Sequence, residues 1–200
     1  MRRTVVLALA LFVLTGVLAL PVLTDLAQAT QLLYRSPQDL AQEATLVFRG
    51  RVESTESYWN AQHTKIFTRT RVSVDETYKG SAGPAVDIVQ LGGVVGTVKV
   101  TVQGALQWKP GEEVLVFAEA YDAGAYQVAG FSQGRFRVER DAATGVAYVD
   151  APPLEDVSLV GAPSADAGRP SEPGGRATLE QFVNQALGRR TEPAEPGVGR

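Results

Sequence analysis

Apolar residues recur at every second position along most of the chain beyond Thr45, and this spacing predicts β-strands rather than helices. In the first such segment, residues 46–52, Phe48 and Val52 alternate with charged residues. The segment 66–75 repeats the pattern, and the polar residues 54–64 between them predict a hairpin tip. Further strands are expected over residues 85–91, 94–102, 114–117, 126–128, 136–138 and 146–149.

Turn-forming residues and glycines divide these strands. Lys109-Pro110-Gly111-Glu112 has the composition of a type II turn and leads into the apolar run 114–117, which is typical of a strand buried on both faces. Many short strands of this kind indicate an all-β fold, an antiparallel sandwich or a small barrel. Glycines inside strand patterns mark bulges or sharp bends, and they favour a closed barrel: Gly50, Gly92, Gly93 and Gly96.

Helices are expected only at the edges of this all-β domain. Ser36 as N-cap and Pro37 at the first helical position predict a short N-terminal helix. Thr178 begins a second helix that Gly188 ends. The predicted organisation is a signal peptide at 1–29, a barrel domain at 30–150, a flexible Pro- and Gly-rich linker at 151–176, a short helix at 177–188 and a disordered tail at 189–200.

The first residues carry the pattern of an export signal. Arg2 and Arg3 precede an uncharged apolar run over residues 4–23, and the tripeptide Ala27-Gln28-Ala29 resembles a signal-peptidase site. The pattern predicts a secreted or periplasmic protein of the bacterial cell envelope whose mature chain begins at Thr30. Because the run approaches the length of about 20 residues that spans a bilayer, an uncleaved membrane anchor is the alternative.

Composition excludes several classes of function. The chain of 200 residues has no cysteine, so thiol catalysis, thiolate metal sites and disulfides are excluded. It has 19 Lys and Arg against 22 Asp and Glu, and this mild acidity argues against a nucleic-acid partner. Removal of residues 1–29 still leaves enough chain for one domain with a core.

The order of these elements resembles a known family. The strand 46–52 carries an "apolar-x-R-G-x-V" pattern after a short helix, residues 76–80 end in Tyr-Lys-Gly, and residues 110–117 form a turn and an apolar strand. Together they resemble the netrin-like, or tissue-inhibitor-of-metalloproteinases-like, OB-fold domain. Residues 130–138 also resemble a "GLxQGKFRV"-type segment of small exported bacterial proteins of unknown role.

The resemblance covers roughly residues 36–140 and implies a small antiparallel OB-like barrel. Tissue inhibitors of metalloproteinases chelate the zinc of their target through an N-terminal cysteine. This chain has no cysteine, so that mechanism is not carried over.

The hairpin tip holds the first group of candidate binding residues. Tyr58 and Trp59 are large aromatics in a polar segment, so they either pack back on the barrel or meet a protein partner. His63, the single histidine, lies in the same segment. A catalytic triad or zinc site would have to be built on this one imidazole, so we expect no catalytic residue, no metal and no cofactor.

Arginines on the outer face of the first two strands form the second group of candidate binding residues: Arg49, Arg51, Arg69 and Arg71. Like charges on neighbouring strands repel unless acids or a ligand lie between them. Either Glu53, Asp75 and Glu139 neutralise the arginines locally, or the face binds an acidic polysaccharide or another envelope polyanion.

The sequence thus predicts an exported, non-enzymatic module that binds an extracytoplasmic protein through the hairpin tip and the barrel rim, as an accessory or inhibitor-like domain. Binding of an acidic polysaccharide or envelope polyanion through the arginine face is the first alternative. A hydrolase that uses paired carboxylates is the second, with candidates Glu53, Glu56, Asp75, Glu76, Glu112, Glu113 and Glu119. Contact with a membrane is expected only if the signal segment stays attached.

Overall fold

The structure, a computed structural model, describes residues 30–122, 124–151, 157–161 and 176–189. The predicted signal segment 1–29, most of the predicted linker and the predicted tail after 189 lie outside the described residues. The elements in chain order are β1 (Thr30–Leu33), α2 (Pro37–Glu43), β2 (Leu46–Trp59), β3 (Ile66–Lys79), β4 (Ala85–Leu91), β5 (Gly93–Val95), β6 (Val98–Val100), β7 (Glu113–Asp122), β8 (Ala125–Val128), β9 (Arg135–Arg140), β10 (Ala147–Asp150), β11 (Val157–Val160), β12 (Ala177–Thr178) and α3 (Leu179–Ala186).

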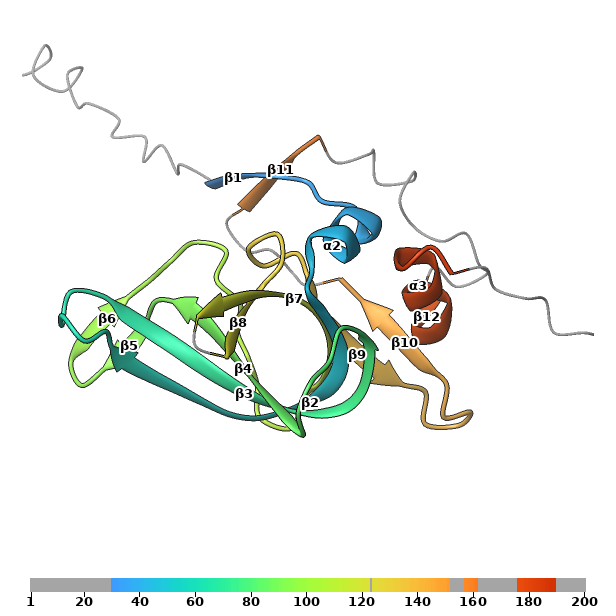
Figure 1. Cartoon of the computed structure of the whole chain (residues 1–200), viewed down its shortest axis with the longest axis horizontal. Helices are drawn as coiled ribbons and strands as arrows, with labels where there is room; N and C mark the ends of the chain where they lie inside the picture. Colours follow the sequence, from blue (N-terminus) through green and yellow to red (C-terminus); the bar gives the residue numbers. More distant parts are fainter. Residues whose placement is uncertain (1–29, 123, 152–156, 162–175, 190–200) are drawn as a thin grey trace, which may run out of the picture.

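Most strands belong to one sheet of eight with the order β12-β10-β9-β7-β2-β3-β4-β8. β8 also pairs with β7. The pairings therefore run from β7 to β2, β3, β4 and β8 and back to β7 (Figure 1). The β4–β8 contact is parallel and consists of one residue pair, Ile88 with Tyr126. The other pairings in this path are antiparallel, so the predicted mostly β, antiparallel architecture is confirmed.

The hairpin of β2 and β3 is long and bends near its base. Its register shifts between Arg49 and Gly50, where a bulge lies. A Cβ atom on Gly50 would lie 2.0 Å from the carbonyl oxygen of Ser73, so only glycine fits at this approach of the two backbones. The glycine that the sequence pattern singled out in this strand therefore marks a bulge.

Strand β7 is buried on both faces, as its apolar run predicts. Leu115 and Phe117 point into a core formed with both helices, β2, β9 and β10. Val114 and Val116 point into a second core formed with β2, β3, β4 and Trp108. Large apolar side chains from the predicted strands are buried in these two cores: Phe48, Val72, Leu115, Phe117, Val128 and Phe136.

The two helices have the predicted N-caps and pack side by side above the sheet (Figure 1). In each helix a capping box closes the first turn, built on Ser36 with Asp39 in α2 and on Thr178 with Gln181 in α3. α3 is not a separate appendage, because Val183 belongs to the same core as Phe117.

Two stretches differ from the sequence expectation. The predicted single strand 94–102 is a short hairpin of β5 and β6, because Gly96 adopts a φ of 59° and reverses the chain. Residues 157–160, inside the range predicted as linker, form β11, which pairs in parallel with β1. Among the described residues no helix is long and apolar enough to cross a membrane.

Candidate binding surface

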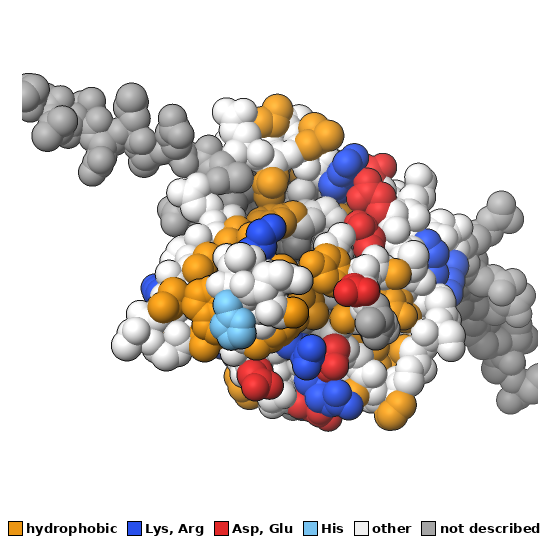
Figure 2. All heavy atoms as spheres, turned by 60° about the vertical axis from the view of Figure 1, so that its left-hand side comes forward, with side chains coloured by type: hydrophobic (Ala, Val, Ile, Leu, Met, Phe, Trp, Pro, Cys, Tyr) orange, Lys and Arg blue, Asp and Glu red, His pale blue; other side chains and the backbone are white. Residues whose placement is uncertain are grey.

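The tip of the β2–β3 hairpin is a fixed turn. Asn60 directs it, since its Oδ1 accepts hydrogen bonds from the backbone N–H groups of Thr64 at 2.8 Å and Lys65 at 2.9 Å. His63 adopts a φ of 53°, which is uncommon for a residue other than glycine. Its exposed imidazole stacks on the Trp59 ring with 6.2 Å between centroids. Figure 2 views this end of the molecule, with hydrophobic side chains beside the histidine.

Tyr58 is half-buried on the outer face of the hairpin. Its ring stacks on that of its cross-strand partner Phe67, 6.2 Å away, and the Arg69 guanidinium carbon lies 5.0 Å from the ring centroid. The structure therefore places three of the sequence candidates, Tyr58, Trp59 and His63, at one end of the hairpin. It adds Phe67, whose role the alternation pattern did not reveal.

The remaining candidate arginines make ion pairs with neighbouring acids. The Arg49 guanidinium lies 2.7 Å from Glu113 and 3.4 Å from Asp75. Arg51 donates a hydrogen bond to the carbonyl oxygen of Gly111 at 2.8 Å. Arg71 lies between two acids, at 3.5 Å from Glu53 and 3.2 Å from Asp87. Local neutralisation thus involves the expected Glu53 and Asp75, together with acids that the sequence pattern did not indicate.

Glu113 is the main partner that the sequence did not indicate. It is buried at the start of β7 and accepts hydrogen bonds from Arg49 at 2.7 Å and Arg140 at 2.7 Å. Burial disfavours its charged form, but the hydrogen bonds from Arg140 and Arg49 outweigh this and lower the pKa of Glu113. A carboxylate held in this way acts as a structural anion, so Glu113 fits poorly as one of a catalytic pair.

A groove of about 590 Å³ opens beside the hairpin tip, where the pairing of β4 with β8 ends. Beyond the single pair Ile88–Tyr126, the last residues of both strands line the groove instead of pairing with each other. Three large hydrophobic side chains on its walls are exposed: Leu91 by 40%, Tyr121 by 49% and Phe131 by 48%. Phe67 also lines the groove and connects it to Tyr58.

Phe131 is presented to the groove by a strained backbone. It adopts a φ of 69°, and the preceding Gly130 adopts 61°. Such a conformation is unfavourable for an aromatic residue and is typical of functional positions. A Cβ atom at Gly130 would lie 2.8 Å from a methyl carbon of Leu40, so the loop is packed tightly against α2.

Gln133 fixes this loop to the residues that connect β1 to α2. Its buried amide accepts a hydrogen bond from the Arg35 backbone N–H at 2.9 Å and donates one to the Leu33 carbonyl oxygen at 2.9 Å. The segment 130–138, noted in the sequence for its resemblance, therefore holds one exposed aromatic on a rigid loop.

The sequence candidates thus gather into two surfaces. The tip surface comprises Tyr58, Trp59, His63 and the groove beside it, and the arginine surface comprises Arg49, Arg51 and Arg71 with their acidic partners. No group of His, Asp or Glu side chains suited to a metal ion occurs in the described part of the chain. Comparison of the chain with known protein families and with curated proteins finds no match.

Proposed function

We propose that the protein is a non-enzymatic binding module of the cell envelope that holds an extended, apolar segment of another protein in the groove between β4 and β8. The observation that carries the proposal is the junction of β4 and β8, where two parallel strands share one residue pair and a groove beside it is lined by exposed Leu91, Tyr121 and Phe131. Large solvated hydrophobic side chains that converge on one hollow are typical of protein-interaction sites.

The strand order supports a finer architectural proposal. The closed path β7–β2–β3–β4–β8–β7, with its one parallel contact between β4 and β8, fits a five-stranded barrel of the OB type. In this proposal the groove is the weakest seam of the barrel wall, and the hairpin tip overhangs one end of it through Lys65 and Phe67.

The groove suits an extended peptide better than a polyanion. Arg35 and Lys65 on its rim are matched by Glu43 and Glu119, and Arg35 already lies 3.4 Å from Glu43. Such a rim has no surplus of positive charge to attract an acidic polymer. An extended peptide directs alternate side chains to one side, so its apolar residues can enter the groove while its backbone follows the neighbouring strand edges.

Selection from a library of displayed random peptides tests the proposal. We expect enriched peptides to carry apolar residues at alternate positions and to bind almost independently of salt. The double variant Tyr121→Ala, Phe131→Ala should weaken binding by about tenfold or more, since exposed aromatics carry much of the energy of an interface. The matched control is Val94→Ala, Val98→Ala, which removes exposed side chains from the β5–β6 hairpin and should leave binding unchanged.

The opposite result would favour the arginine surface. Enrichment of acidic peptides, a steep loss of binding with salt, and sensitivity to substitution of Arg49, Arg51 and Arg71 would replace the groove proposal with polyanion binding. That alternative requires an acidic ligand to compete with the ion pairs that Arg49 and Arg71 already make.

A further inference from the structure

A second hollow, bordered by the loop 101–107, is lined by cationic side chains. It has a volume of about 350 Å³, and the described residues that line it include Lys109, Arg135 and Arg137 but no aspartate or glutamate. The rest of the lining comes from the loop 101–107, which contributes Thr101, Gln103 and Gln107. This cavity shares Ala105 and Leu106 with the lining of the groove, but its cationic residues belong neither to the groove nor to the arginine surface.

Arg135 is the unusual member of this group. Its side chain is buried, with 3% of its surface exposed, and its guanidinium carbon lies 5.4 Å from the Trp108 ring centroid. Glu112 accepts a hydrogen bond from its Nη2, but its buried Nε finds no acceptor among the described residues. Because burial outweighs the attraction of Glu112, the pKa of Arg135 is lowered, so its positive charge is only partly compensated.

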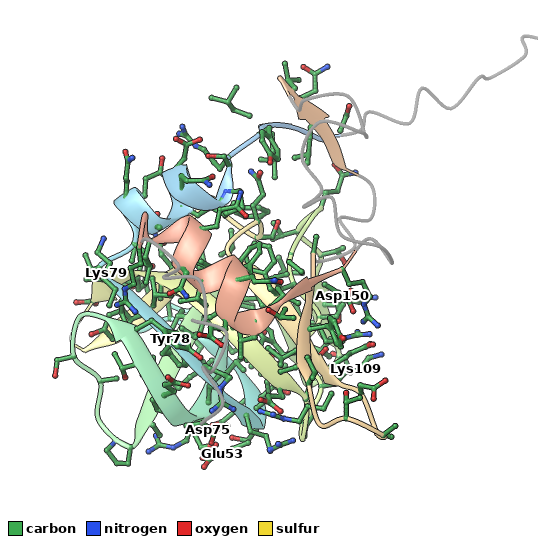
Figure 3. The ribbon with its side chains drawn as sticks, turned by 90° about the vertical axis from the view of Figure 1, so that its right-hand side faces the viewer. Glu53, Asp75, Tyr78, Lys79, Lys109 and Asp150 are labelled. Carbon is green, nitrogen blue, oxygen red and sulfur yellow. The ribbon has the colours of Figure 1, made fainter. Side chains whose placement is uncertain are left out.

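The acids near the cavity are already shared. Glu112 also accepts a hydrogen bond from Arg137 Nε at 2.8 Å, so one carboxylate serves two guanidinium groups. Glu139 lies 3.9 Å from Arg137 but 2.6 Å from Arg176, which also contacts Asp150. Figure 3 shows Lys109 and Asp150 at one edge of the molecule. Within the described part of the chain Lys109 makes no ion pair, so it adds a third cation to the wall.

We infer that this cavity binds a tetrahedral oxyanion, a sulfate or phosphate group, either free or carried on a saccharide. Glu112 is shared by two of the three cationic side chains and Glu139 lies closer to Arg176 than to Arg137, so the cavity keeps a surplus of positive charge that suits an oxyanion. Arginine fits the oxygens of such a group with parallel hydrogen bonds. Hydroxyl and amide groups of the loop 101–107 supply further polar contacts.

Nuclear magnetic resonance of the purified protein provides the test, with inorganic sulfate and inorganic phosphate added against a constant chloride background. We expect the Arg135 Nε–H and Trp108 Nε1–H resonances to shift and saturate together. Lys109→Gln should weaken the affinity about tenfold, because it removes a charge-assisted hydrogen bond. Arg71→Gln, the matched loss of one positive charge on the arginine surface, should leave the affinity unchanged.

Two results would overturn the inference. One is the absence of a saturable shift with either anion, and the other is an equal loss of affinity in Arg71→Gln, which would indicate general charge attraction. A sulfated and a phosphorylated monosaccharide distinguish the sources. Tighter binding of either sugar than of its inorganic anion assigns the site to a carried group, and equal binding assigns it to the free anion.

Discussion

The ammonium group of Lys79 lies 2.6 Å from the carbonyl oxygen of Ala44 and thereby closes the C-terminal end of helix α2. It donates a second hydrogen bond to the Ala41 carbonyl oxygen at 2.7 Å. Ala41 lies in the last turn of the helix and Ala44 is its C-cap residue. Carbonyl groups at this end lack partners within the helix, and a positive charge is favourable there. The Tyr-Lys-Gly segment that ends β3 is therefore a helix cap supplied by a strand.

Replacement of this lysine should destabilise the fold. Lys79→Met removes the charged donor but keeps the apolar stem, so we expect a loss of about 1–2 kcal/mol in the free energy of unfolding. Chemical denaturation measures it, and Lys99→Met, at an exposed lysine in β6, is the control that should change stability little. Equal effects in the two variants would show that the cap contributes nothing.

Phe117 should be among the most costly side chains to truncate. It is fully buried and its ring contacts Phe136 at 5.7 Å and Phe182 at 6.4 Å between centroids. Phe117→Ala should lower the free energy of unfolding by about 3–5 kcal/mol. The same truncation at the exposed Phe131 should cost far less, and a thermal melt of both variants compares them directly. Similar melting temperatures would contradict the central position of β7.

Substitution of Phe131 tests whether its strained backbone serves binding at the expense of stability. Phe131→Gly relieves the left-handed backbone, so we expect the free energy of unfolding to rise by about 0.5–1 kcal/mol while affinity for the selected peptides falls. Gly130→Ala should instead lower the free energy of unfolding, because the added Cβ atom would lie too close to Leu40. If Phe131→Gly lowers stability, the aromatic ring serves packing rather than binding.

The acid stability of the protein should depend on Glu113. Its pKa in the folded state is lowered from the ordinary value of 4.5, so its contribution is fully present above pH 4.5 and is lost as the pH falls through the lower, folded value. The stability difference between the parent and Glu113→Gln should therefore be constant near neutrality and shrink below pH 4.5. Denaturation at a series of pH values measures it, with the exposed Glu56→Gln as the control. A difference that stays constant into acid would refute the assignment.

Much of the local structure was predictable because its cause is local. Ser36 and Thr178 cap helices through residues three positions away, and Gly111 turns the chain within its own tetrapeptide, with a φ of 85°. The burial of β7 on both faces was likewise predictable, because it follows from a run of consecutive apolar residues.

The candidate sites were less predictable because their parts are distant in the chain. Glu113 meets Arg49 and Arg140 only after three strands have paired, and no spacing in the sequence reveals that contact. The groove depends on how β4, β8 and the loop after β8 come together, which brings Leu91 and Phe131 to one hollow. Packing of α3 on the sheet was missed for the same reason.

The two-sided burial of β7 has a thermodynamic consequence. Leu115 and Phe117 serve one core while Val114 and Val116 serve the other, so neither core can open without exposing the strand that completes its neighbour. Helix α3 and the groove therefore belong to a single cooperative unit, which should unfold in one transition. A ligand bound in the groove then protects amide hydrogens in α3 from exchange with solvent, even though it does not touch that helix.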